Sequence, residues 1–184
     1  MLHLVIPDQE LWDPKRERFI TICGGEFDLE HSLASISKWE SKWRIPFHDN
    51  KKQKTLEQNI DYVRCMSLSP VTEPYVFNYL TDKNVKDIAD YIGDTHTATW
   101  FNDAATRRTG KKEIVTAEII YYWMTVYNIP DSYEYWHLNK LMTLIRVCAE
   151  KNNADAKKNK STSQTAAQRR ALNAARKKRF HTRG

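Results

Sequence analysis

The chain is poor in glycine and contains no long hydrophobic run. Five of its 184 residues are glycine, and it has neither a G-x-G-x-x-G segment nor a P-loop, which argues against a nucleotide site built from a glycine-rich loop. No apolar stretch approaches the roughly 20 residues that a membrane-spanning helix needs. The first residues lack the basic flank and the small-residue cleavage site of a signal peptide. We therefore expect a soluble protein of the cytoplasm.

The chain also lacks the residue spacings of common catalytic and metal sites. Its three cysteines, Cys23, Cys65 and Cys148, are far apart and odd in number, unlike a disulfide framework or a paired zinc motif. No two of the six histidines lie four residues apart as in helical zinc sites. Ser35 and Lys38 form a Ser-x-x-Lys pattern, but the other motifs of penicillin-recognising enzymes do not follow. We expect a non-enzymatic protein without metal or cofactor.

Two histidines have neighbours that could in principle build a site. His31 follows Asp28 and Glu30, and we interpret these acids as the polar entry to a helix, where negative charge is favourable. His137 follows Trp136, and we interpret it as a packing residue on a helix face. A metal role for the first histidine and a catalytic role for the second are the alternatives.

Acidic residues are almost absent from the last part of the chain. Residues 151–184 contain eleven lysines and arginines and one acid, Asp155, which gives this part a charge of +10 although the whole chain carries +6. Apart from Leu172 and Phe180 it has no large apolar side chain, so it cannot form a core. We expect residues 151–184 to be a basic linker and arm, either disordered or helical.

The two halves of this basic part differ in composition. Residues 154–165 are rich in Lys, Asn, Ser and Thr, which is typical of linkers. Residues 166–180 are rich in Ala, Gln and Arg and have strong helix propensity. Their charges go most of the way round such a helix, which leaves it no apolar side to dock. The cationic residues of the expected arm are Arg169, Arg170, Arg176, Lys177, Lys178, Arg179 and Arg183.

Aromatic residues are concentrated in the rest of the chain. The part before residue 151 contains all six tryptophans, all nine tyrosines and five of the six phenylalanines, enough for one core. We predict a mainly α fold, with a helical bundle over residues 32–150 and a small N-terminal β element over residues 1–31 packed on it. Residues 2–6 and 18–23 have strand patterns that predict a hairpin, and residues 26–29 could add a third strand.

Apolar residues recur at helical spacing after the β element. One stripe predicts a first helix that ends at Pro46, and its members are Leu29, Leu33, Ile36, Trp39 and Trp43. A polar loop is predicted over residues 94–112. The helix predicted over residues 113–128 is apolar on nearly every face, so we expect it in the middle of the bundle. The other predicted helices cover residues 56–68, 73–80, 82–92 and 131–150.

Three segments of the chain resemble bacteriophage tail assembly chaperones. They are HSLASISKWESKW at residues 31–43, EIIYYWM at residues 118–124 and WHLNKLMTLIRVC at residues 136–148. The segment RALNAARKK at residues 170–178 also resembles the end of those proteins. The resemblance implies a non-enzymatic protein of the host cell cytoplasm. Such a protein binds the tape-measure protein of a siphophage and keeps it soluble until the tail assembles.

A helical domain can offer a groove to a helix of such a partner. The candidate partner-binding residues are the aromatic side chains that we expect to be half exposed, namely Trp39, Trp43, Trp100, Phe101, Tyr133 and Trp136. One alternative is a structural protein of the virion, at a head–tail or tail-tube contact. A weaker alternative is nucleic-acid binding through the basic arm, which would be sensitive to salt. The apolar surplus could also serve self-association.

Overall fold

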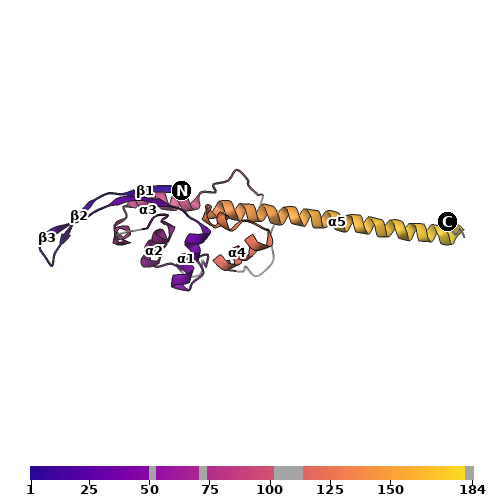
Figure 1. Ribbon diagram of the computed structural model, residues 1–184, viewed down its shortest axis with the longest axis horizontal. Coiled ribbons are helices and arrows are strands. Elements are labelled where there is room, and N and C mark those ends of the chain that lie inside the picture. The colour runs from indigo at the N-terminus through magenta and orange to yellow at the C-terminus, as the bar shows by residue number, and fades with distance from the viewer. Residues whose placement is uncertain (50–52, 71–73, 102–113, 181–184) are drawn as a thin grey trace. The chain divides into compact units, whose positions relative to one another are not determined.

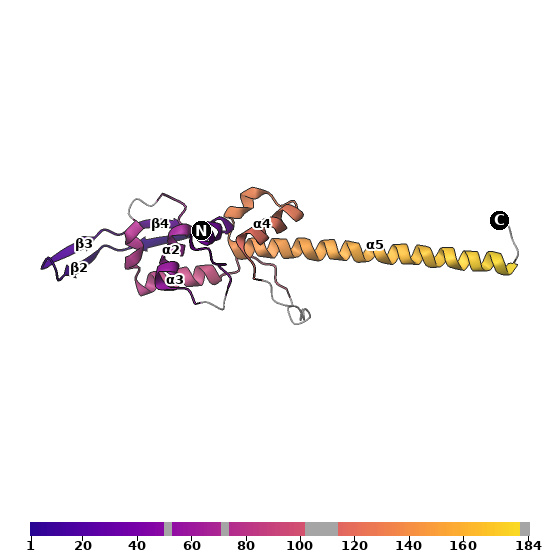
Figure 2. The same ribbon diagram turned by 90° about the horizontal axis from the view of Figure 1, so that it is seen from below.

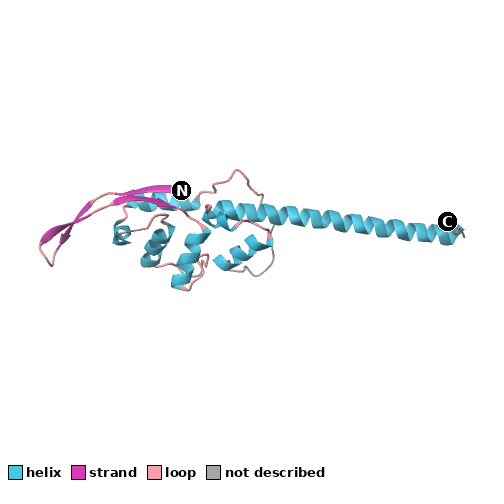
Figure 3. Ribbon diagram, viewed as in Figure 1, coloured by secondary structure: helices cyan, strands magenta, loops and turns pink. Residues whose placement is uncertain are grey.

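A computed structural model describes the chain over residues 1–49, 53–70, 74–101 and 114–180 (Figure 1). The fold is mostly helical with a small N-terminal β part, as predicted (Figure 3). The chain divides into two compact units, Met1–Thr143 and Leu144–Gly184. This division comes earlier than residue 150, where the sequence led us to expect the end of the helical domain.

The N-terminal part forms two antiparallel strand pairs. β1 (Leu2–Ile6) pairs with β4 (Gly25–Leu29), and β2 (Gln9–Asp13) pairs with β3 (Arg18–Ile22). The turn predicted around Pro14 is present between β2 and β3. The predicted hairpin of the first strand with β3 is wrong, however, because β2 lies opposite β3 and leaves β1 to pair with β4.

The two strand pairs continue each other in one register. Leu2 lies opposite Leu29 in the first pair, and Gln9 lies opposite Ile22 in the second, so neither side of the ribbon has an inserted residue. We call β1 and β4 the proximal ribbon, and β2 and β3 the distal ribbon. Figure 2 shows the distal ribbon running on from the proximal ribbon, away from the neighbouring helices.

The ribbon is interrupted at Pro7 and Gly24, between its two halves. Proline has no backbone N–H to give to the ladder. A Cβ atom on Gly24 would lie 1.9 Å from the backbone oxygen of Ile6, so only glycine fits where the two chains approach. The backbone N–H of Gly24 donates to the Asp8 carboxylate at 2.7 Å. This side-chain bond takes the place of a ladder bond at the interruption.

Neighbouring segments occupy both edges of the proximal ribbon. On the β1 edge, the side-chain amide of Asn84 donates to the backbone oxygen of Val5 at 2.9 Å. On the β4 edge, the backbone N–H of Leu68 donates to the backbone oxygen of Asp28 at 2.9 Å. Backbone groups that would otherwise be open to another strand are therefore already bonded.

α1 (Leu33–Trp43) follows the ribbon and confirms the predicted first helix. The Ser32 hydroxyl accepts from the backbone N–H of Ser35 at 3.2 Å and caps the start of the helix. Arg44 ends the helix in the left-handed conformation, with a φ of 56°. The fully buried members of the predicted stripe are Leu29, Leu33, Ile36 and Trp39.

Two further helices also confirm the predictions. α2 (Leu56–Met66) begins at a Thr55 cap, and α3 (Asp82–Gly93) begins at a Thr81 cap. The helix predicted over residues 73–80 is instead a 3-10 helix, η1 (Pro74–Tyr79). A segment of six residues gains too few i to i−4 bonds for a stable α-helix, and the tighter 3-10 form is common at that length.

α4 (Ala117–Val126) is shorter than predicted and lies at the surface of the bundle. Ala117, Ile120 and Met124 are buried in it, whereas Tyr122 is 64% and Val126 is 50% exposed. The expectation of a helix buried on all sides was therefore wrong. α4 packs against α1 with one face, and its opposite face meets solvent although it is apolar.

The last helix is longer than predicted. After the 3-10 helix η3 (Asp131–Tyr135), α5 (Leu138–Phe180) continues without a break. Of the two predicted forms of the basic part, disordered or helical, the structure has the helical one over residues 151–180. No glycine or proline occurs between Pro130 and Gly184, so nothing in the sequence interrupts the helix. Within the described part of the chain, no helix combines the length and the apolar character that crossing a bilayer requires.

Candidate functional site

Two of the predicted partner-binding aromatics lie on α1, in different environments. Trp39 is fully buried, and its indole N–H donates to the backbone oxygen of Gln58 at 2.9 Å. The expectation that Trp39 is half exposed was wrong, because α2 covers this side of α1. Trp43 lies one turn later and is half-buried, and its indole N–H donates to the Asp61 carboxylate at 2.8 Å. Trp39 is therefore a core residue.

Two other predicted aromatics stack on each other after η3. The rings of Tyr133 and Trp136 lie 3.9 Å apart at an angle of 15°, and the Lys140 ammonium lies 4.2 Å from the centre of the Trp136 ring. Both rings are half-buried, so they form a small, partly exposed aromatic surface with a cation on it. Of the remaining two candidates, Trp100 is 81% exposed and Phe101 is half-buried.

The sequence did not predict a further apolar surface on α4. Its members share one face because they are spaced at i, i+3, i+4 and i+7, and they are Ile119, Tyr122, Trp123 and Val126. We call these four residues the α4 outer face. Tyr122 and Val126 are exposed, and the other two are half-buried. The spacing was visible in the sequence, but apolar residues on the other sides of the same helix hid which face meets solvent.

The cationic residues of the predicted arm are exposed on α5 wherever the structure describes them. Arg183 lies outside the described residues. No acidic residue follows Asp155 in the sequence, so no ion pair along the helix can offset these charges. The described members are Arg169, Arg170, Arg176, Lys177, Lys178 and Arg179.

Three histidines come together where the start of α1, the end of α3 and the start of α5 meet. The His137 ring lies 5.2 Å from the His31 ring and 4.1 Å from the His96 ring. Nδ1 of His31 is hydrogen-bonded to the buried hydroxyl of Tyr62. The sequence separated these histidines by tens of residues, so their proximity comes from the packing of three helices.

His137 is held in one neutral form. Its Nδ1 is 3.3 Å from the backbone nitrogen of Asn139, and its Nε2 is 3.1 Å from the backbone oxygen of Tyr91. An amide N–H can only donate and a carbonyl can only accept, so the ring proton is on Nε2. Burial lowers the pKa of His137, and the nearby His96 lowers it further, against the bond to Tyr91 that raises it. The ring thus caps the start of α5 as a neutral acceptor.

We expect the protein to lose stability as the pH falls below about 6.5. Burial above all, with the nearby imidazole groups of His137 and His48, lowers the pKa of His31 to about 3. Below pH 6.5 the unfolded chain binds a proton at this histidine that the folded chain does not bind. The free energy of unfolding therefore has its highest value above pH 6.5 and decreases as the pH falls toward 3. For His31 alone, the free energy of unfolding decreases by about 2 kcal/mol between pH 7.5 and pH 5. Urea unfolding at both pH values measures it, and a His31→Gln variant with an unchanged pH dependence would contradict it.

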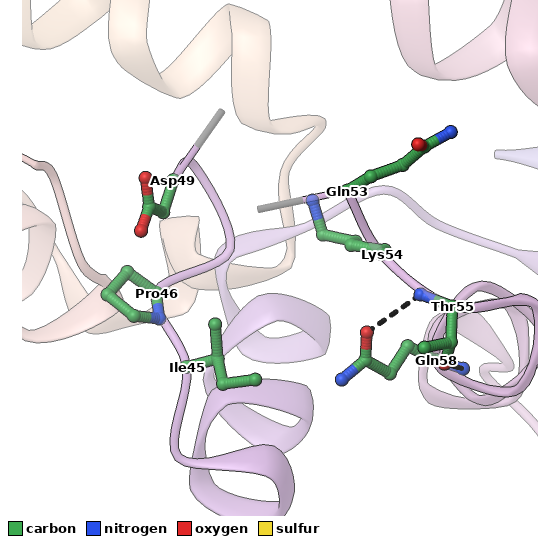
Figure 4. Close-up of a pocket in the computed structure, with 7 residues that line it drawn as sticks. All are labelled: Ile45, Pro46, Asp49, Gln53, Lys54, Thr55 and Gln58. Atoms are coloured by element: carbon green, nitrogen blue, oxygen red, sulfur yellow. Dashed lines mark hydrogen bonds between the residues drawn. The ribbon is translucent and has the colours of Figure 1, made fainter. Parts of the chain in front are cut away.

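A small pocket lies between the end of α1 and the start of α2 (Figure 4). Its volume of about 160 Å³ is below the roughly 300 Å³ at which ligand sites begin. The Lys54 ammonium donates to the backbone oxygen of Phe47 at 2.8 Å, and burial lowers its pKa against the effect of Asp49. We interpret the pocket as a surface depression. It is lined by Ile45, Pro46, Asp49, Gln53, Lys54, Thr55 and Gln58.

The α4 outer face and the cationic end of α5 are both exposed among the described residues. Among the described residues, no three or more His, Cys, Asp or Glu side chains lie where they could hold a metal ion together. No protein-family model, no curated protein and no solved structure matches the chain.

Proposed function

We propose that the protein is a tail assembly chaperone of a siphophage, which binds the tape-measure protein and keeps it soluble. The proposal is supported by the resemblance of residues 31–43, 118–124 and 136–148 to proteins of that kind. The second of these segments forms most of α4. It also contains three of the four residues of the α4 outer face.

The α4 outer face is the observation that carries the proposal. Leaving apolar area in water costs about 25 cal/mol per Å², and a contiguous apolar surface usually marks an interaction site. Tyr122 and Val126 lie one turn apart on this face and are both exposed. A stripe of this spacing packs well against the apolar stripe of a second helix. A tape-measure protein is a long helical chain with such stripes, so it is a partner that needs this surface.

The basic arm is better suited to contact with a protein than to sequence-specific binding of a nucleic acid. Its charges surround the helix, and its described part has no aromatic side chain that could stack on bases before Phe180. Charge alone would give binding to nucleic acid without sequence preference. In the proposed function the arm contacts acidic stretches of the tape-measure protein while the α4 outer face holds an apolar stripe.

Co-expression with the tape-measure protein of the same phage tests the proposal. We expect a soluble complex that co-purifies, and a tape-measure protein that is insoluble when expressed alone. The Val126→Gln variant should reduce the yield of complex several-fold, because it puts an amide on the α4 outer face. Val85→Gln is the matched control, since Val85 is similarly exposed on α3, and it should leave the yield unchanged.

Two results would count against the proposal. If the two proteins neither co-purify nor change each other's solubility, the chaperone function is wrong. Mass spectrometry of purified virions gives the second test, because an assembly chaperone should be absent from the particle. A stoichiometric amount in the virion would instead favour a structural role at a head–tail or tail-tube contact.

A further inference from the structure

The distal ribbon has two open strand edges. Among the described residues, β2 and β3 pair with each other and with no further strand. The side-chain amide of Gln9 donates to the backbone oxygen of Tyr79 at 2.6 Å and ties the base of this ribbon to η1. The proximal ribbon differs, because Asn84 and Leu68 occupy its two edges. An open edge offers unpaired backbone groups to another strand.

Each face of the distal ribbon carries an apolar cross-strand pair. On one face Trp12 lies opposite Phe19, with ring centres 5.1 Å apart in an edge-to-face arrangement. These two side chains are 53% and 66% exposed. On the other face Leu11 lies opposite Ile20. A two-stranded ribbon in water is marginally stable by itself, so burial of these faces would stabilise it further.

We propose that the distal ribbon is an assembly surface, on which β2 of one copy of the chain adds antiparallel to β3 of the next copy. The occupant of the open edge is therefore a second copy of this chain. The contact repeats the pairing that β2 and β3 already make within one chain. Each pair then becomes part of a ladder that runs through successive copies. The repeated pairs are Trp12 with Phe19, Leu11 with Ile20, and Asp13 with Arg18.

Charge favours this contact over the two symmetric ones. β2 carries the acidic residues Glu10 and Asp13, and β3 carries Arg18. A β2 strand paired with another β2 strand about Leu11 would set Asp13 opposite Gln9 and would give the acidic residues no cation. A β3 strand paired with another β3 strand about Ile20 would set Arg18 opposite the apolar Ile22. The addition of β2 to β3 is the arrangement that sets opposite charges against each other.

The contact joins two different surfaces of identical copies, so it closes into a ring if its rotation allows. Each ribbon adds two strands, or about 10 Å of width, whereas a unit of the size of Met1–Thr143 is roughly 35 Å across. A flat row of ribbons would make neighbouring units clash. Ribbons that converge on a common axis avoid the clash. Each added copy makes the same contact again, so we expect an assembly of several copies.

Sedimentation equilibrium of the full chain tests the proposal without any substitution. The expected mass at high micromolar concentration is a multiple of the chain mass of 21.7 kDa. A monomer at every concentration would overturn the proposal. Phe19→Lys should shift the mass toward the monomer, because it puts charges into the ladder. Leu56→Lys, an exposed apolar residue at the start of α2, is the matched control and should leave the mass unchanged.

Cross-linking identifies which strands meet, even if Phe19→Lys disturbs folding. Two variants are made in a chain whose native cysteines are replaced by alanine, one with Leu11→Cys and one with Ile20→Cys. A short thiol-specific cross-linker should join the two variants when they are mixed, because residue 11 of one copy lies opposite residue 20 of the next. Neither variant alone should give a dimer. Dimers of Leu11→Cys alone, or no dimers in the mixture, would overturn the proposed contact.

The inference does not rest on the proposed function, and the two can fail separately. A chain that stays monomeric but co-purifies with the tape-measure protein would refute the assembly and support the chaperone. A chain that assembles but does not bind the tape-measure protein would support the assembly and refute the chaperone function.

Discussion

Replacing Gly24 by alanine is expected to lower the free energy of unfolding by about 3 kcal/mol. The new Cβ atom would lie 1.9 Å from the backbone oxygen of Ile6 and 2.6 Å from the backbone carbon of Pro7. Neither atom belongs to a flexible side chain, so the two strands must separate. Their separation also breaks the bond from the Gly24 N–H to Asp8. Urea unfolding at fixed protein concentration measures the loss.

Gly93→Ala is the matched control for this substitution. Gly93 is the last residue of α3, and a Cβ atom there would meet nothing within 4 Å. Its φ is not positive, so alanine fits the backbone and should stabilise the protein by up to about 1 kcal/mol. If the two variants lost the same free energy of unfolding, the close approach of the two strands at Gly24 would not be the cause of the loss.

The Glu40→Gln variant should lose about 2–4 kcal/mol of stability. The Glu40 side chain on α1 is buried. One carboxylate oxygen accepts from the backbone N–H of Phe47 at 2.6 Å, and the other accepts from the backbone N–H of Ala117 at 2.8 Å. Thr116 makes no side-chain bond to the start of α4, so Glu40 caps that helix from another element and places its charge at the positive helix end. Glutamine turns one acceptor into a donor that faces an N–H.

Glu57→Gln separates this effect from a general loss of charge. Glu57 lies in the first turn of α2 and is exposed, and Thr55 already caps that helix. We expect a change below about 0.5 kcal/mol. Thermal or urea unfolding of the two variants gives the comparison. A Glu40→Gln protein as stable as the Glu57→Gln protein would mean that the cap contributes little.

The helices that the sequence predicted well have local signals. α1, α2 and α3 each begin at a Ser or Thr cap whose side chain accepts from the third residue of the helix. The apolar stripe of α1 also showed which side faces the core. These signals lie within about a dozen residues, so they can be read without knowing the rest of the fold.

The strand pairing could not be read in the same way. The choice between β3 and β4 as the partner of β1 depends on residues that lie 19 to 27 positions away in the observed pairs. It also depends on Pro7 and Gly24 allowing the ribbon to continue past the interruption. The sequence left the choice between a disordered and a helical form of residues 154–165 open for a different reason. Their composition suggested a linker, but no residue there stops a helix that has already begun.

Two of the candidate partner-binding residues, Tyr133 and Trp136, are half-buried as expected, and they stack on each other within one turn. Trp39 was misjudged because α2, which is distant in sequence, covers it. The α4 outer face was missed for the same reason, since burial of one side of a helix is decided by the elements that pack on it.

The shared register of the ribbon limits how related chains can change in length. One extra residue between β1 and β2 would shift every distal pair by one position and turn each side chain of β2 to the opposite face. Trp12 would then leave Phe19. An insertion keeps the register if it is matched by another beside Gly24, or if it falls in the turn between β2 and β3. Evolutionary relatives should therefore differ in the length of that turn, or by insertions that occur in pairs across the ribbon.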